Sequence, residues 1–307
     1  IVFDEFAPTL AGLKDAFEGY HTEVDPTVTM EFSQAVYRFG HSMLTKTVDR
    51  FDADFNPITD TFSGDASQLD LFEAFLNPLA LYNAGDDGQA TMRPEDASGS
   101  VIRGIVRTRA NEIDEFVTGV LQNNLVGLPL DLGAINIARG REVGNAPLNA
   151  ARRRYFRETG DARLLPYGSW ADYLDNLRHE PTLVNFIAAY GTHPLVAGED
   201  KIVGTADDSE MSFKYRRAAA CAIVGALADD AGEYCANLGF MTEVEASLTM
   251  VNMTPADALD FLYSTGEWAN TEDGVTITGL DDVDLWNGGL AEERMPFGGH
   301  LGSTHNY

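Results

Sequence analysis

Residues 35–44, Ala35-Val-Tyr-Arg-Phe-Gly-His-Ser-Met-Leu44 (AVYRFGHSML), place a single histidine inside an apolar pattern with helical spacing. Residues three apart on a helix share a face, so Arg38 and His41 are expected to point at the same neighbour. Gly40 removes a side chain beside the imidazole and permits close approach of a partner. Two interpretations of His41 follow: a packed core residue, or a ligand that acts with Arg38 on a broad, flat group with an anionic edge.

A second stretch, residues 134–141 (AINIARGR), repeats this geometry. Asn136 and Arg139 are three residues apart and are expected to share a face. A histidine that binds a metal usually donates its other N–H to a fixed acceptor, and a buried Asn136 would supply one. The ordinary alternative for this pair is a helix cap or a surface contact.

The composition narrows the function classes. The chain has 307 residues and a net charge of -27, from 48 acidic and 21 basic residues. Such acidity would repel nucleic acid and anionic membrane surfaces over most of the molecule. The chain contains no run near the roughly 18 apolar residues that a membrane span needs. We therefore expect a soluble globular protein, with the basic run 152–154 forming a solvated helix face.

Two further patterns can be judged from spacing alone. Asp52, Asp54 and Asn56 begin like a calcium-binding loop, but Pro57 replaces the required glycine and Ser63 the closing glutamate. We reject an EF-hand there.

The two cysteines, Cys221 and Cys235, are too few for a disulfide framework and lack zinc-site spacing. A single disulfide bond between them is one interpretation that the sequence leaves undecided.

Helical periodicity dominates the chain, which predicts a mainly α fold without a glycine-rich phosphate loop. One short helix, ended by Pro78, is expected after a loop or hairpin. Glycine is expected to end two helices, at Gly144 and Gly160. The main expected helices cover residues 28–45, 101–123, 131–144 and 145–160, with more beyond 165.

Three stretches resemble the signatures of the animal-type haem peroxidases, in the family's order. Residues 31–44 (EFSQAVYRFGHSML) resemble the proximal-histidine helix, and residues 131–149 (DLGAINIARGREVGNAPLN) resemble the next signature. Residues 282–293 (DVDLWNGGLAEE) with 298–304 (GGHLGST) resemble the third, and FDEFAPTLAG precedes all three.

The resemblance implies a peroxidase domain over residues 1–195 and 275–307. Residues 196–274 are similar to a helical insertion of large bacterial members.

Carried over by position, the resemblance implies that His41 is the axial ligand of the haem iron and that Asn136 orients its imidazole. Arg38 and Arg139 fall where the family pairs arginines with haem propionates. The motif from Asp284 to Glu292 is expected to be structural.

Some positions depart from the family or match none of its ligands. Glu142, Val143 and Gly144 stand where the family usually has Asp-His-Gly. The remaining histidines match no ligand position and are expected to be surface or packing residues: His21, His179, His193, His300 and His305.

The implied function is reduction of hydrogen peroxide with oxidation of an organic or halide donor, using haem b or a modified haem. The family's distal histidine, distal arginine and calcium loop precede the segment that matches Ile1. We therefore expect a proximal portion of a longer bacterial protein, secreted or at the cell surface, whose remainder supplies the distal side and any calcium. The alternatives are a non-catalytic structural or adhesive module that keeps the scaffold, and a haem carrier or sensor.

Overall fold

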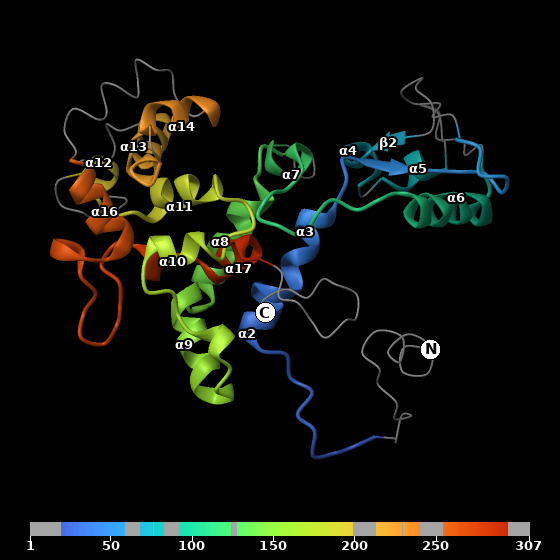
Figure 1. The fold of residues 1–307 in the computed structure, drawn as a ribbon. Helices are drawn as coiled ribbons and strands as arrows, with labels where there is room; N and C mark the ends of the chain where they lie inside the picture. Colours follow the sequence, from blue (N-terminus) through green and yellow to red (C-terminus); the bar gives the residue numbers. More distant parts are fainter. Residues whose placement is uncertain are drawn as a thin grey trace. The chain divides into compact units, whose positions relative to one another are not determined.

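The computed structural model describes residues 20–58, 68–75, 77–82, 92–123, 128–198, 213–228, 230–239 and 254–293. The chain divides into two compact units, one of residues 33–142 and one of residues 1–32 with 143–307 (Figure 1). Helices dominate the described part of both units, which confirms the mainly α expectation. Several predicted features lie outside the described residues: FDEFAPTLAG, Ser63, the GGHLGST stretch, His300 and His305.

The unit of residues 33–142 combines short helices with a two-stranded antiparallel ribbon, in which Thr47 pairs with Asp70. Leu69, Ala74 and Ala80 form a small core cluster. Helix α2 (Met30–Gln34) includes the boundary between the two units. The elements that follow it in this unit are η2 (Val36–Phe39), α3 (Gly40–Met43), β1 (Thr47–Asp49), β2 (Gln68–Asp70), α4 (Leu71–Ala74), α5 (Pro78–Leu81), α6 (Pro94–Arg107), α7 (Gly119–Asn123) and α8 (Leu132–Glu142).

The expected single helix over residues 28–45 is wrong, because this stretch forms three short helical segments. Ala35 leaves helical geometry at φ -122° and ψ -71°, and the Arg38 N–H donates to the Ala35 carbonyl at 3.0 Å in a 3₁₀ turn. At the other end, Asn111 donates from its backbone N–H to Met43 and from its side chain to the Leu44 carbonyl. These long-range bonds end the helix at Met43.

The expected helix over residues 101–123 is also wrong, since it is divided between α6 and α7. Pro94 starts α6 at a position that suits proline, and Thr108 is already extended. The Thr108 hydroxyl donates to Asp49 Oδ2 at 2.8 Å, which ties the chain to β1. A Cβ on Gly104 would collide with the Asp49 carbonyl, so α6 and β1 pack backbone to backbone there.

Two smaller expectations have different outcomes. Pro78 does not simply end a helix: α4 ends at Ala74, and Pro78 opens α5. Gly144 and Gly160 follow α8 and α9 (Leu148–Thr159) with φ of +79° and +70°, as expected for glycine-marked helix ends.

The second unit is built around α11 (Thr182–Tyr190), which is buried along most of its length. It packs against α13 (Phe213–Gly225), whose small side chains from Ala218 to Ala222 are buried. The predicted insertion therefore contributes α13 to the same unit as α11. The other elements are η4 (Ala162–Leu164), α10 (Trp170–Leu174), α12 (Pro194–Ala197), α14 (Ala231–Asn237), α16 (Pro255–Tyr263), η7 (Gly266–Trp268), η8 (Leu280–Asp282) and α17 (Leu285–Ala291).

Arg152 corrects the expectation that residues 152–154 form a solvated face. Its side chain is 7% exposed and bonds Glu292 Oε1 at 2.6 Å. Its other nitrogens donate to the carbonyls of Arg163 and Leu165. The Tyr167 hydroxyl donates to the same Glu292 oxygen at 2.7 Å. Burial of this charge is tolerated because its donors are satisfied, and only the tertiary structure provides the acceptors.

The motif from Asp284 to Glu292 makes contacts that hold the fold together. The Tyr190 hydroxyl donates to Asp284 Oδ2 at 2.7 Å. A Cβ on Gly288 would lie 2.7 Å from Val283 and 3.0 Å from Leu148, so glycine permits the packing of α17 on α9. These contacts support a structural role for the motif.

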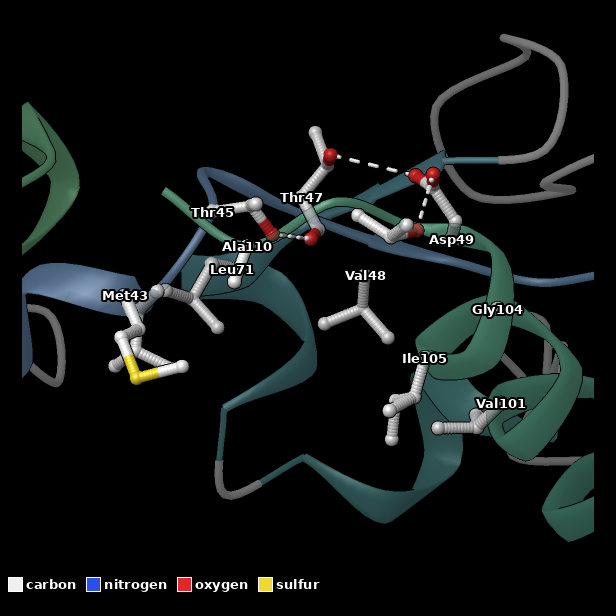
Figure 2. A pocket seen from close by; sticks show the side chains of 12 residues that line it. Met43, Thr45, Thr47, Val48, Asp49, Leu71, Val101, Gly104, Ile105 and Ala110 are labelled. Carbon is white, nitrogen blue, oxygen red and sulfur yellow. Dashed lines mark hydrogen bonds between the residues drawn. The ribbon is translucent and has the colours of Figure 1, made fainter. Parts of the chain in front are cut away.

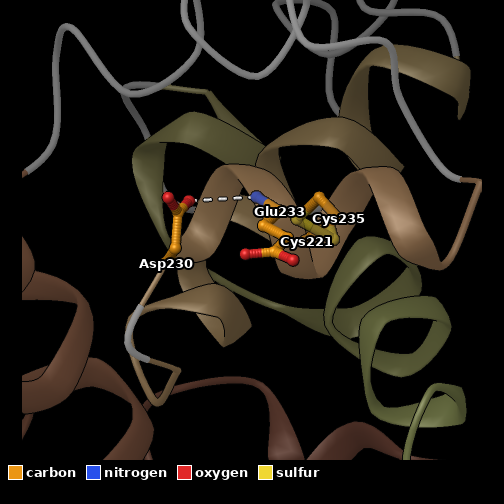
Figure 3. The surroundings of a disulfide bond; sticks show 4 residues. All are labelled: Cys221, Asp230, Glu233 and Cys235. Carbon is orange, nitrogen blue, oxygen red and sulfur yellow. Dashed lines mark hydrogen bonds between the residues drawn. A yellow bond between two sulfur atoms is a disulfide. The ribbon is translucent and has the colours of Figure 1, made fainter.

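Cys221 on α13 and Cys235 on α14 form a disulfide, which resolves the pairing that the sequence left open (Figure 3). Asp230 caps α14 by accepting from the Glu233 N–H at 3.0 Å. No helix within the described residues is both long enough and apolar enough to span a membrane.

Replacing Arg152 with Met is expected to cost about 3–5 kcal/mol of unfolding free energy, because Glu292 would stay charged and buried. Denaturant unfolding followed by circular dichroism measures this. The double variant Arg152→Met/Glu292→Leu should lose less than Arg152→Met alone. Arg154→Met, at an exposed position, is the control and should change stability by less than about 0.5 kcal/mol. Equal losses for Arg152→Met and Arg154→Met would contradict the buried pair.

Replacing both cysteines with alanine is expected to cost about 3 kcal/mol, because the bridge closes a loop with a sequence separation of 14 residues. The midpoint of thermal unfolding measures the loss. Reduction of the natural chain should reproduce the loss and should leave the double-alanine variant unchanged. A midpoint that does not respond to reductant would argue against the bridge.

Candidate functional site

His41, Arg38 and Asn136 meet within the unit of residues 33–142. Arg38 lies on η2, His41 on α3 and Asn136 on α8. Arg38 Nη1 donates to Asn136 Oδ1 at 2.9 Å, and Asn136 Nδ2 lies 2.8 Å from His41 Nδ1. The sequence expectation that Arg38 and His41 face one neighbour is met, and that neighbour is Asn136.

The arginine fixes the orientation of the Asn136 amide. A guanidinium group has N–H donors and no acceptor, so the amide atom that faces it must be the carbonyl oxygen. The NH₂ group of Asn136 is then the atom that faces His41, and it can only donate. His41 Nδ1 is therefore the acceptor in this contact.

Gln34 is a member of this cluster that the sequence analysis missed. Its Oε1 accepts from Arg38 Nη2 at 2.7 Å, so the two terminal nitrogens of the guanidinium are held by two different side-chain amides. The available signal was the spacing of four residues between Gln34 and Arg38, which places side chains together on a helix. The signal was weak because α2 and η2 do not form one continuous helix.

Burial is graded across the cluster. Asn136 has no exposed surface, whereas His41, Arg38 and Gln34 are half-buried. A buried amide held by two side chains keeps a fixed position, and the imidazole beside it is oriented by that contact. The Nδ1 edge of the ring thus lies against a buried side chain, while the residue as a whole is half-buried.

Gly40 has no need to be glycine for its own backbone. Its φ of -59° and ψ of -17° are ordinary right-handed values, and an added Cβ would meet no described atom within 4 Å. Open space therefore lies beside the Gly40 backbone, next in the chain to His41. A half-buried imidazole, an adjacent cation and a neighbouring residue without a side chain fit a flat metal-containing group with anionic substituents, such as haem.

Arg139 is not brought into this cluster, although Asn136 is three residues away. Its side chain is 52% exposed and bonds Glu142 Oε2 at 2.8 Å. Glu142 is one of the positions at which the chain departs from the family signature. An exposed ion pair of this kind contributes little to stability, so it leaves Arg139 available to another anion.

The surroundings lower the pKa of the His41 imidazole. Burial is the larger cause, and the positive charge of Arg38 adds to it. As the pH falls, the imidazole in the unfolded chain takes up a proton near pH 6.5, whereas the imidazole in the folded chain takes it up only at a lower pH. The stability associated with neutral His41 is therefore present above that pH and is lost as the pH falls through the lower, folded pKa. A neutral imidazole is the form that binds metals.

An apolar pocket of about 340 Å³ lies beyond α3 in the same unit (Figure 2). Met43, Val48 and Ile105 are among the side chains around it. Neither His41, Arg38 nor Asn136 lines this pocket. It is therefore separate from the candidate site.

Two of the other described histidines, His21 and His193, occupy a surface and a packing position. His21 is exposed beside Glu23. His193 is buried, stacks on Trp268 and lies 2.9 Å from Asp257. Its Nδ1 also accepts the Leu195 N–H at the start of α12, so it has a structural role. His179 is half-buried.

The family model described as animal haem peroxidase matches residues 1–195 of the chain. The chain therefore belongs to the animal haem peroxidase family. It is similar to peroxinectin A of Dictyostelium discoideum, with 28% identity over 192 residues, which are 60% of this chain and 30% of that protein.

It is also similar to human thyroid peroxidase, with 32% identity over 134 residues, which are 42% of this chain and 13% of that protein. The matched part is thus less than a third of the length of either relative. The structure of peroxidase A from Dictyostelium discoideum aligns with a TM-score of 0.46 and 20% identity, covering 96% of this chain and 36% of that one.

Replacing Arg38 with Met is expected to raise the pKa of His41, because the nearby positive charge that disfavours the imidazolium is removed. Titration of ¹⁵N-histidine-labelled protein by NMR measures this, with His41 assigned by its loss in His41→Gln. Arg139→Met is the matched control and should leave the His41 titration unchanged. A titration of His41 that is the same with and without Arg38 would contradict the electrostatic effect.

Proposed function

We propose that this chain forms the proximal side of the haem site of an animal-type peroxidase, with His41 as the axial ligand of the iron. The supporting observation is the contact of His41 Nδ1 with the fully buried amide of Asn136. This contact occupies Nδ1 and leaves Nε2 as the ring nitrogen that could reach a metal. Membership of the haem peroxidase family supports haem as the group bound.

The roles of the chain's residues follow from their chemistry. Asn136 orients the imidazole, and the lowered pKa of His41 favours the neutral ring, which metal binding requires. Arg38 and Arg139 would bind the carboxylates of haem through charge-assisted hydrogen bonds. In this proposal, the open space at Gly40, next in the chain to His41, accommodates part of the ring system. When bound, haem supplies the two electrons that reduce hydrogen peroxide to water and recovers them from an organic or halide donor.

We further propose that the distal side is supplied by the remainder of a longer protein. Peroxide cleavage needs a base that moves a proton between the two oxygens and a cation that stabilises the developing charge. In this proposal, His41, Asn136 and Arg38 serve the proximal side only. The same proposal includes a bacterial source, an organic or halide electron donor, and any calcium being bound by the remainder of the protein.

An exported or cell-surface location is also proposed. The Cys221–Cys235 disulfide supports it, because such bonds persist in oxidising compartments. The strongly acidic composition is compatible with an exported protein.

The test of this function compares His41→Ala with His21→Ala, a change at an exposed histidine. After reconstitution with haem, the His41→Ala chain should lose the absorption and Raman signatures of an axial imidazole, and the same change in the longer parent protein should lower peroxide-dependent dye oxidation by at least about 100-fold. Added imidazole should partly restore the axial signature. His21→Ala should behave like the natural chain.

Unchanged spectra for His41→Ala would overturn the ligand assignment. Failure of the natural chain and its parent protein to bind haem would favour a non-catalytic scaffold, and haem binding by the parent protein without dye oxidation would favour a carrier or sensor.

A further inference from the structure

The hydrogen bonds around Asn136 run in one direction. Arg38 donates to Asn136 Oδ1, and Asn136 Nδ2 donates to His41 Nδ1. A neutral imidazole carries one ring proton, so a histidine that accepts at Nδ1 carries its proton on Nε2. In this arrangement Nε2 has no lone pair to offer to a metal.

Iron binding requires the opposite arrangement. Nδ1 lies 2.8 Å from a fully buried amide, so Nε2 is the nitrogen that could reach the iron. For Nε2 to bind, the ring proton must be on Nδ1, and Nδ1 must then donate to an acceptor. Asn136 can accept only if its amide rotates by about 180° and turns Oδ1 toward His41.

Arg38 opposes this rotation. Rotation of the amide would turn Asn136 Nδ2 toward Arg38 Nη1, which places one donor against another in a buried position. The rotation therefore requires the guanidinium to leave Asn136. The second nitrogen, Nη2, is bonded to Gln34 Oε1 at 2.7 Å, so Gln34 helps to hold the arginine in its present place.

A carboxylate can draw Arg38 away. The guanidinium binds a carboxylate through two parallel charge-assisted hydrogen bonds, which are stronger than its bonds to the neutral amides of Asn136 and Gln34. Once Arg38 is bound to the carboxylate, Asn136 Oδ1 is free to accept from His41. The released amide then favours the tautomer that binds iron.

We propose that Arg38 and Asn136 form a two-position relay, in which capture of a haem carboxylate by Arg38 switches His41 to its iron-binding tautomer. This inference rests on the proposed haem site. The coupling is reciprocal: a carboxylate on Arg38 favours the axial bond, and the axial bond favours carboxylate binding by the same factor. Arg38 is thus a positioning residue for His41 as well as an anion-binding residue.

The first test reads the tautomer in the chain without haem. ¹⁵N-histidine NMR at a pH well above the His41 pKa should find the His41 proton on Nε2. Arg38→Met should remove this preference and give a clearly populated Nδ1–H form. Arg139→Met should keep the natural pattern.

A natural chain with the His41 proton on Nδ1 would overturn the relay, as would an unchanged tautomer in a folded Arg38→Met variant. If Arg38→Met does not fold, Gln34→Ala keeps the arginine but removes one anchor. It should shift the tautomer population in the same direction, and an unchanged population would count against the relay.

The second test compares haem with its dimethyl ester, which lacks both carboxylates. In the natural chain the ester should show at least about tenfold weaker axial ligation by His41 than haem does, measured by the iron–imidazole Raman band. In Arg38→Met the difference between the two porphyrins should shrink to the part that depends on Arg139, whereas Arg154→Met, a change at an exposed position outside the cluster, should keep the full difference. Equal ligation of both porphyrins by the natural chain would overturn the relay.

The two tests separate failure of the relay from failure of the proposed function. If neither porphyrin binds, the haem proposal fails while the tautomer measurement still stands. If haem binds through His41 but the tautomer never depends on Arg38, the haem proposal stands and the relay fails.

Discussion

The candidate site depends on the limited hydrogen-bonding capacity of one buried amide. Asn136 has no exposed surface, and its single oxygen and single NH₂ group serve Arg38 and His41. Water is excluded from the amide, so a change in its hydrogen bond to Arg38 also changes its hydrogen bond to His41. The position of Arg38 therefore determines whether Asn136 donates to His41 or accepts from it.

A different constraint holds the second unit. Arg152 on α9 and Glu292 after α17 form a buried ion pair, with further bonds from Tyr167 and to two backbone carbonyls. A buried charge is costly unless it is paired and hydrogen-bonded, as Arg152 is here. The signature from Asp284 to Glu292 thus places acidic side chains where the fold needs acceptors, and a close-packed glycine where α17 meets α9.

Local sequence signals predicted the parts of the structure that depend on nearby residues. The glycines after α8 and α9 take left-handed conformations, and the helical character of the chain follows from its periodicity. Local sequence signals predicted wrong helix boundaries where distant segments form hydrogen bonds with the chain. Asn111 and Asp49 draw the chain out of helices that periodicity alone would extend. Arg152 likewise looks like a surface residue until its distant acceptor is known.

The sequence by itself identified the family, because three stretches resemble its signatures in the family's order, and helical spacing paired Arg38 with His41 and Asn136 with Arg139 as candidates. Only the tertiary structure brought α8 beside α3, buried Asn136 and excluded Arg139 from the cluster. It also added Gln34, which no signature marks, and set the direction of each hydrogen bond. Direction depends on which donors and acceptors meet in three dimensions, and spacing along a chain carries no information about that.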